Sequence, residues 1–308
     1  MGREFSGDDR RPLAELLAAH DPQRPDASTR RLRLLVAYDG SDFFGAQVQP
    51  GKRTVGSELE EAIATLTGAP ARITFAGRTD RGVHAAGQVA HCTVTTALTD
   101  EQLLRGLNAV LPEDAAVLHL ATVASDFHAR YDALWREYRY RIWNAPVRVP
   151  ALARTTWHLS APLVLDALAA GAARLVGEHD FAAFAGQGLG VPGRPRARST
   201  VRRVDEADWS VLPLDVPAPA GRLVELRIRA SGFLPQMVRT IVGALVEVGR
   251  GRQEPDWIAA LLAEQDRAQA PAPAPPQGLM LWAVGYRNEA AAASGSQRAG
   301  ETRSGVQV

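Results

Sequence analysis

An aspartate flanked by arginines lies in a polar segment that is rich in glycine. Residues 75–93 read F-A-G-R-T-D-R-G-V-H-A-A-G-Q-V-A-H-C-T, which places Asp80 between Arg78 and Arg81. A carboxylate beside cations is ionised at neutral pH and can act as a nucleophile without special activation. A competing interpretation is structural, with the Asp80 side chain bonded to its own backbone in a turn.

Two apolar runs flank this segment, at residues 73–76 and 89–94, and both have the composition of strands. The residues between them, including His84 and Gln88, predict a polar loop punctuated by glycines, which suit tight turns and close backbone approaches. Catalytic groups are often displayed on loops that a rigid scaffold holds. The segment therefore predicts a candidate catalytic loop between two strands.

The first half of the chain predicts an α+β domain over residues 31–124, preceded by a flexible tail at 1–30. Between its first strand and first helix, residues 41–50 predict a loop that offers Gln47 and Gln49 to polar ligands. In order, the expected elements are a strand at 31–38, a helix at 55–67 capped by Thr54 and ended by Gly68, the two strands above, a helix between Thr99 and Pro112, and a strand at 116–122. This is the order of a split βαβ, ferredoxin-like domain.

The second half predicts a related domain over residues 125–287, with larger insertions, and a disordered tail at 288–308. Its expected elements are a strand at 137–143, a helix at 163–176, hairpin strands at 201–212 and 223–230, a helix from Pro235 to Val248, a shorter helix from Pro255 and a strand at 279–286. The fold class is therefore α+β, with antiparallel or mixed sheets flanked by helices. The second half repeats the theme of the first, so two ferredoxin-like domains are expected, although no sequence identity between the halves proves that both share this architecture.

Bulk properties narrow the functional classes only a little. The formal net charge is +1, so a polyanionic partner would have to be bound by local clusters of arginine. The single cysteine, Cys92, excludes an intrachain disulfide framework. His84, His91 and Cys92 suggest a metal, but simple alternation along a strand explains His91 better. No signal peptide or membrane-spanning run is evident, so a cytoplasmic protein is expected.

Three separated motifs resemble the signatures of the TruA family of tRNA pseudouridine synthases. They are G-R-T-D-x-G-V-H-A with G-Q-V-A, then F-H-A-R-Y-D-A-L-W-R-E-Y-R-Y at residues 127–140, and then F-L-P-Q-M-V-R-T-I-V-G at residues 233–243. A closing G-L-x-L-x-x-V-x-Y follows at residues 278–286. The four matches occur in the family's order across residues 31–287, and the resemblance therefore covers most of the chain.

The resemblance implies roles for individual residues. Asp80 is the nucleophile, Tyr138 stacks on the target base, and Arg239 lies against the catalytic aspartate. The chemistry of Arg78 allows it to hold Asp80 in place, to occupy the gap that a flipped base leaves, or to do both. From the residues alone, each has a structural alternative: an ion pair for Arg78, a core aromatic on an alternating strand for Tyr138, and an exposed arginine on a buried helix for Arg239.

The resemblance also implies the reaction and its partners. Such enzymes isomerise uridine to pseudouridine at positions 38–40 in the anticodon stem-loop, and they act as homodimers whose two domains join over a basic cleft. No metal or organic cofactor is expected, because the isomerisation exchanges no electrons. Binding of tRNA is assigned to Tyr138, to side chains of the loops already described, and to a basic run at 194–203. The loop side chains are Gln47, Gln49, Arg81 and His84, and the basic run contributes Arg194, Arg196 and Arg198.

Departures from the family pattern occur at four positions. Arg81 replaces a small residue, Ala46 a frequent tryptophan, and Pro235 and Gln236 replace basic or polar residues. Two other functions compete with the isomerase. A tRNA-binding or folding protein that has lost catalysis would not need the intact set of Asp80 and its proposed partners. A carboxylate glycosidase would need a second acidic residue, and none is obvious beside Asp80.

Overall fold

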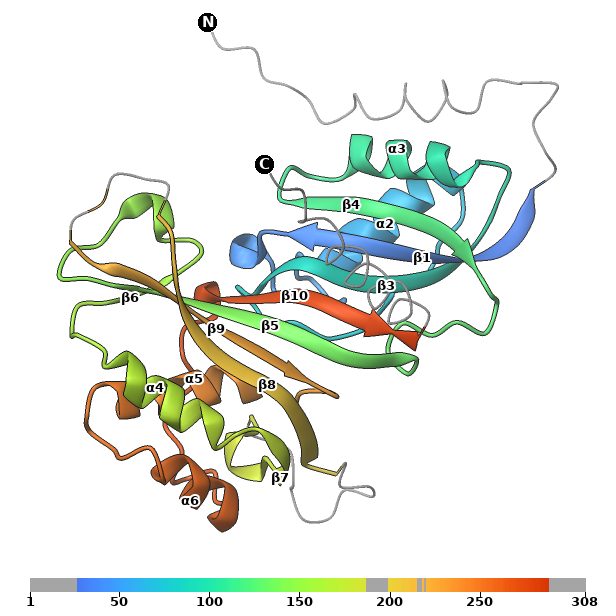
Figure 1. Ribbon diagram of the computed structural model, residues 1–308. Helices are drawn as coiled ribbons and strands as arrows, with labels where there is room; N and C mark the ends of the chain where they lie inside the picture. Colours follow the sequence, from blue (N-terminus) through green and yellow to red (C-terminus); the bar gives the residue numbers. More distant parts are fainter. Residues whose placement is uncertain (1–26, 187–198, 215–217, 219, 288–308) are drawn as a thin grey trace, which may run out of the picture. The chain divides into compact units, whose positions relative to one another are not determined.

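Strands and helices follow one another in two rounds of the order strand, helix, strand, strand, helix, strand (Figure 1). The computed structural model describes residues 27–186, 199–214, 218 and 220–287. It divides into an N-terminal unit that ends at Tyr131 and a C-terminal unit that begins at Asp132. Most of the predicted tails, at 1–26 and 288–308, lies outside the described residues. In the part of the chain that is described, no helix is long and apolar enough to cross a bilayer.

The N-terminal unit is an antiparallel sheet in the strand order β4-β1-β3-β2, with helices α2 and α3 packed on it (Figure 1). This is the ferredoxin-like order that the sequence predicts. Its elements are β1 (Ser28–Tyr38), α2 (Val55–Thr67), β2 (Thr74–Phe75), β3 (His84–Thr96), α3 (Asp100–Val110) and β4 (Ala115–Val123), with a 3-10 turn, η1 (Gly40–Asp42), after β1.

Alternation and capping explain why these residues form these elements. Along β1, Leu32, Leu34 and Val36 are buried and alternate with partly exposed residues, so one face of the strand joins the core. Helix α2 begins with a capping box formed by Thr54 and Ser57 and ends at Gly68 in the left-handed region, with φ of 74°. Helix α3 begins with the predicted capping box of Thr99 and Gln102. The predicted starts and stops of both helices are confirmed.

The C-terminal unit repeats this arrangement with additions. Its sheet has the order β10-β5-β9-β8-β7, and β6 pairs in parallel with β5. In this sheet β10, β5, β9 and β8 take the places that β4, β1, β3 and β2 take in the N-terminal sheet, which confirms two related halves. The elements are β5 (Ala133–Asn144), η2 (Pro150–Leu152), β6 (Trp157–Leu159), α4 (Leu165–Ala173), β7 (Gly177–Asp180), η3 (Ala182–Phe184), β8 (Val201–Leu212), β9 (Arg222–Ala230), α5 (Met237–Gly249), α6 (Trp257–Glu264), η4 (Pro276–Gly278) and β10 (Leu279–Tyr286).

The two faces of β5 differ as the alternation predicts. Tyr138, Tyr140 and Ile142 are buried, at 7%, 0% and 0% exposure. On the other face, Arg139 and Arg141 form ion pairs with Glu225 of β9, at 3.3 and 2.7 Å. The sheet therefore buries one face in an apolar core, and an arginine–glutamate network lines the other.

Several predicted boundaries need correction. Strand β3 begins at His84 rather than at Val89, because Ala85 and Gln88 continue the ladder with β1. His84 and Gln88 therefore lie on a strand, and the loop before it is shorter than predicted. Helix α5 begins at Met237 rather than at Pro235, because Gln236 adopts φ of 59° and cannot continue the helix backward.

Two further details concern helices α4 and α5. Helix α4 spans Leu165–Ala173 and is shorter at both ends than the predicted 163–176. Gly243, in α5, lets the backbone of the segment before β10 approach closely, because a Cβ at this position would lie 2.6 Å from the carbonyl oxygen of Ala272.

Candidate active site

Asp80 lies in the short loop that joins β2 to β3, at residues 76–83. Its side chain is half-buried, and its backbone carbonyl accepts a hydrogen bond from the amide of Val83 at 3.1 Å. Gly82 turns the chain between them with φ of 77°, a conformation that L-residues with a side chain rarely adopt. The sequence therefore provides a tight turn that displays a carboxylate at the end of a sheet.

A chain of buried polar groups lies beneath this loop. The hydroxyl of Tyr38, at the end of β1, is 2.8 Å from the hydroxyl of Thr79. The amide of Gln88, on β3, donates to the carbonyl of Gly77 at 2.7 Å and accepts from the amide of the same residue at 3.3 Å. Gln88 also donates to the Tyr38 hydroxyl at 3.4 Å. These contacts hold the residues immediately before Asp80 against the two central strands.

The segment between β1 and α2 supports the loop from another side. The amide of Ala46 donates to the carbonyl of Thr79 at 3.1 Å, and the amide of Gly82 donates to the carbonyl of Phe43 at 3.4 Å. A Cβ added at Gly45 would lie 2.7 Å from the Thr79 carbonyl oxygen. Glycine is therefore required at this position for the two backbones to approach, in addition to its φ of 93°.

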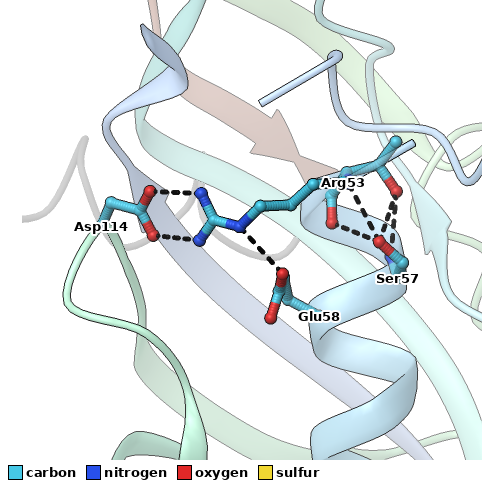
Figure 2. Close-up of polar contacts among 5 residues, drawn as sticks. Arg53, Ser57, Glu58 and Asp114 are labelled. Atoms are coloured by element: carbon cyan, nitrogen blue, oxygen red, sulfur yellow. Dashed lines mark hydrogen bonds and ion pairs between the residues drawn. The ribbon is translucent and has the colours of Figure 1, made fainter. Parts of the chain in front are cut away.

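Arg53 anchors this supporting segment, as Figure 2 shows. Its guanidinium donates two hydrogen bonds to Asp114, both at 2.7 Å, and a third to Glu58 of α2 at 3.0 Å. The same group lies 4.2 Å from the ring centroid of Phe43. Hydrogen bonding to Asp114 raises the pKa of Arg53 above its ordinary value. The contacts tie residues 43–53 to the start of α2 and to the turn before β4.

His84 is buried at 2% exposure, and its Nδ1 accepts a hydrogen bond from the amide of Gly40 at 3.0 Å. The same nitrogen is 3.1 Å from a carboxylate oxygen of Asp39. This burial favours a role in supporting the turn after β1 over a direct contact with a substrate. His91 and Cys92 are also buried, and the Nδ1 of His91 accepts from the amide of Ala129 at 3.1 Å.

Two of the remaining side chains predicted to bind substrate in the N-terminal unit, Arg81 and Gln49, contact Phe44. The guanidinium of Arg81 is 4.3 Å from the Phe44 ring centroid, and the ammonium of Lys52 is 4.8 Å from it. The Gln49 amide donates to the Phe44 carbonyl at 2.8 Å, while Gln47 is exposed. The unusual arginine at position 81 therefore stacks on an aromatic ring. Arg78 is exposed on the loop.

Tyr138 and Arg239 belong to the C-terminal unit. The ring of Tyr138 packs edge-on against Phe233, with centroids 5.1 Å apart, at the start of the third sequence motif. The Nε of Arg239 donates to the carbonyl of Ala274 at 2.7 Å, and the Ala274 amide donates back to the Arg239 carbonyl at 2.9 Å. These contacts hold Tyr138 in the middle of β5 and Arg239 in the first turn of α5. Arg194, Arg196 and Arg198 lie outside the described residues.

Sequence reasoning did not assign roles to the residues that hold the loop. The sequence predicts Tyr38 as the end of a strand and indicates no role for Arg53. Gln88 belongs to the first motif, but the sequence predicts it only as a polar residue of the loop. The sequence contains one signal for its role. Gln88 directly precedes an apolar run with the composition of a strand, and a glutamine that is buried in a strand must find hydrogen-bond partners.

Comparison with known proteins agrees with the motifs. Residues 34–132 and 172–287 match the model of a family described as tRNA pseudouridine synthase. A tRNA pseudouridine synthase A from Solidesulfovibrio magneticus is 48% identical over 261 residues, covering 83% of this chain and 91% of the relative. Proteins of the same name from Syntrophotalea carbinolica and Methylococcus capsulatus are each 42% identical, covering 83% and 84% of this chain and 96% and 90% of the relatives.

Proposed function

Because the chain belongs to the tRNA pseudouridine synthase family, we propose that it isomerises uridine to pseudouridine in tRNA with Asp80 as the nucleophile. The observation that carries this proposal is the placement of Asp80. Its carboxylate is half-buried at the tip of a loop that is held from two sides. Preorganised loops of this kind are where enzymes display reacting groups.

The reaction itself conserves every atom of the nucleotide. The bond between N1 of uracil and C1′ of the ribose breaks, the base turns, and C5 joins C1′ while its proton leaves to solvent and N1 gains one. No electrons are exchanged, so the chemistry calls for a nucleophile and proton transfer rather than a redox group. A carboxylate at Asp80 can attack the sugar or the base, or can remove the proton from C5.

The other catalytic roles follow from the family resemblance. Arg78, which is exposed beside Asp80, pairs with the carboxylate or occupies the gap left by the flipped base. Tyr138 offers a flat aromatic face to the target base and a hydroxyl for a polar contact. Arg239 supplies a second cation to the catalytic carboxylate. Flipping costs least in loops and at helix ends, where stacking is already weak.

The proposed substrate is the anticodon stem-loop of tRNA, with uridines at positions 38–40 as targets and the enzyme acting as a cytoplasmic homodimer. Gln47, Gln49 and Arg81 are proposed contacts on the N-terminal unit. Arg81 and Lys52 gather cationic groups beside Phe44 at this loop, which suits a phosphate backbone. The basic run from Arg194 to Arg198 is proposed to bind phosphates as well.

A mapping experiment tests this function. The purified protein is incubated with an unmodified tRNA transcript, and pseudouridines are located by carbodiimide labelling and primer extension. We expect modification only at positions 38–40, and none with Asp80→Ala, which should still bind tRNA. Pseudouridine formed by Asp80→Ala would rule out the nucleophile assignment. Wild-type protein that binds tRNA without modifying it would favour a tRNA-binding protein that has lost catalysis.

The basic run has its own test. Replacing Arg194, Arg196 and Arg198 with alanine should weaken tRNA binding and flatten its dependence on salt, because fewer counterions are released. A filter-binding titration at several salt concentrations measures both effects. An unchanged salt slope would remove this run from the binding surface.

A further inference from the structure

We propose that Gln88, Tyr38 and Thr79 are positioning residues that hold the catalytic loop through a chain of hydrogen bonds. The proposal rests on the role assigned to Asp80. Thr79 and Gln88 lie within the first motif, but the resemblance assigns no role to either residue or to Tyr38. None of the three has the charge or position of a reacting group. All three are nevertheless polar and almost completely buried, at 0%, 5% and 6% exposure.

The orientation of the Gln88 amide is fixed by its partner. Gly77 presents both an amide N–H and a carbonyl to the same side chain, at 3.3 and 2.7 Å. The oxygen of Gln88 must face the N–H, and its nitrogen must face the carbonyl, because the reverse orientation would oppose two donors and two acceptors. The amide therefore cannot flip without losing both bonds.

The chain continues from Gln88 to Thr79. The second N–H of Gln88 donates to the Tyr38 oxygen at 3.4 Å. The Tyr38 and Thr79 hydroxyls are 2.8 Å apart, and either of them can donate this hydrogen bond. Burial raises the pKa of Tyr38 to about 12, so the phenol keeps its proton throughout the neutral range. Gln88 is thus linked through Tyr38 to Thr79, the residue directly before Asp80.

The chain holds the loop at two points that flank Arg78. Gly77 is bound through its backbone and Thr79 through its side chain, so the segment leading into Asp80 is fixed on both sides of Arg78. The Thr79 carbonyl is held independently by the amide of Ala46 at 3.1 Å. Loss of the hydrogen bonds among the Gln88, Tyr38 and Thr79 side chains should therefore loosen the loop without unfolding it.

The unit contains a control with the same bonding pattern in Asn108. Its side-chain amide binds both backbone groups of a single residue, Val117, in the same manner, at 2.8 and 2.9 Å. Asn108 lies on α3 and clamps β4, and it makes none of the contacts of the catalytic loop. Asn108 is exposed whereas Gln88 is buried, so the unfolding free energies of Asn108→Ala and Gln88→Ala are measured alongside kcat to separate stability from positioning.

The test compares steady-state kinetics on tRNA for Gln88→Ala, Tyr38→Phe and Asn108→Ala, each well below its melting temperature. We expect kcat to fall about 10- to 100-fold for the first two with KM changed less than about threefold, since small displacements of a reacting group cost rate. Asn108→Ala should keep the kcat of the wild type. Thr79→Ser, which keeps the hydroxyl, should retain activity, and Thr79→Val should lose it.

Three outcomes would overturn the proposal: equal kcat for Gln88→Ala and Asn108→Ala, full activity of Thr79→Val, or losses confined to KM. Asp80→Asn in the same assay separates this failure from failure of the proposed function. If Asp80→Asn is inactive while Tyr38→Phe and Gln88→Ala are fully active, only the positioning chain is wrong. If Asp80→Asn is active, the role of Asp80 itself is wrong.

Discussion

The two halves of the chain share a strand order but differ in the hairpin formed by two consecutive strands of the chain, β2–β3 and β8–β9. In the N-terminal unit, the second strand, β2, has only 2 residues, and the chain leaves the sheet to form the loop of Asp80. In the C-terminal unit, the equivalent strand, β8, has 12 residues and pairs with β9 from Val204 to Leu212. Shortening one strand therefore frees a segment for chemistry, while the long version builds a plain hairpin.

The two units also differ in where their buried polar side chains lie. In the N-terminal unit, buried polar side chains such as Gln88 and Thr79 gather under the loop. In the C-terminal unit, the buried carboxylates Glu137 and Glu225 lie along the sheet face and pair with arginines. One network positions a loop and the other reinforces a sheet, so the first should affect rate and the second stability.

The largest expected effect comes from adding a side chain where the segment between β1 and α2 approaches the loop of Asp80. Gly45→Ala places a Cβ 2.7 Å from the Thr79 carbonyl, so the catalytic loop must move. We expect kcat to fall by about 100-fold. Gly51→Ala is the matched control, because Gly51 also has positive φ but nothing lies within 4 Å of its added Cβ. Equal kcat in the two variants would show that the close approach does not matter.

A substitution in the arginine–glutamate network of the C-terminal unit should lower stability and leave kcat unchanged. Glu225→Gln weakens the pairs with Arg139 and Arg141 in a site that is 3% exposed. We expect the free energy of unfolding to fall by roughly 1–3 kcal/mol, measured by urea denaturation, with kcat unchanged. A large loss of kcat in a folded protein would contradict the division between the two networks.

Arg53→Lys should have a smaller, mixed effect. Lysine cannot reproduce the two parallel bonds to Asp114 together with the bond to Glu58. Because Arg53 is 36% exposed, the loss of unfolding free energy should be modest, about 1 kcal/mol, and it should decrease at high salt. Thermal melts at two salt concentrations measure it. A loss that salt does not change would show that packing on Phe43 dominates.

The remaining predicted effect is absent at neutral pH and is expected only at high pH. Burial raises the pKa of Tyr38 from 10.0 to about 12. The unfolded chain therefore loses this proton first, and the contribution to stability is complete below pH 10 and is lost as pH rises to about 12. The free energy of unfolding is measured by denaturation at several pH values between about 9 and 12. It should decrease with pH less steeply for Tyr38→Phe than for the wild type, and the two slopes should differ by at most about 1.4 kcal/mol per pH unit. Burial also raises the pKa of Tyr140, so part of the fall should remain.

Much of the fold was predictable because its signals are local. The capping boxes at Thr54 and Thr99 and the alternation along β5 each depend on residues close in sequence. Asp80 is proposed as the nucleophile from a motif in which the aspartate and its glycines are neighbours in sequence. These features need no knowledge of which segments meet in space.

The support of the site was not predictable, because it depends on distant pairs. Tyr38 and Thr79 are 41 positions apart, and Arg53 and Asp114 are 61 apart. The misplaced start of β3 has the same origin, since only pairing with β1 shows that the polar residues His84 and Gln88 belong to a strand. The local composition of these residues is typical of a loop, but pairing with β1 makes them part of a strand.

The central claim is that the carboxylate in this loop performs the isomerisation. The most direct test is tritium release from tRNA that carries uridine tritiated at C5, because formation of the C5–C1′ bond expels that atom to water. We expect release by the wild type and none by Asp80→Asn, with tRNA binding retained by both. Release by Asp80→Asn at the wild-type rate would contradict the account.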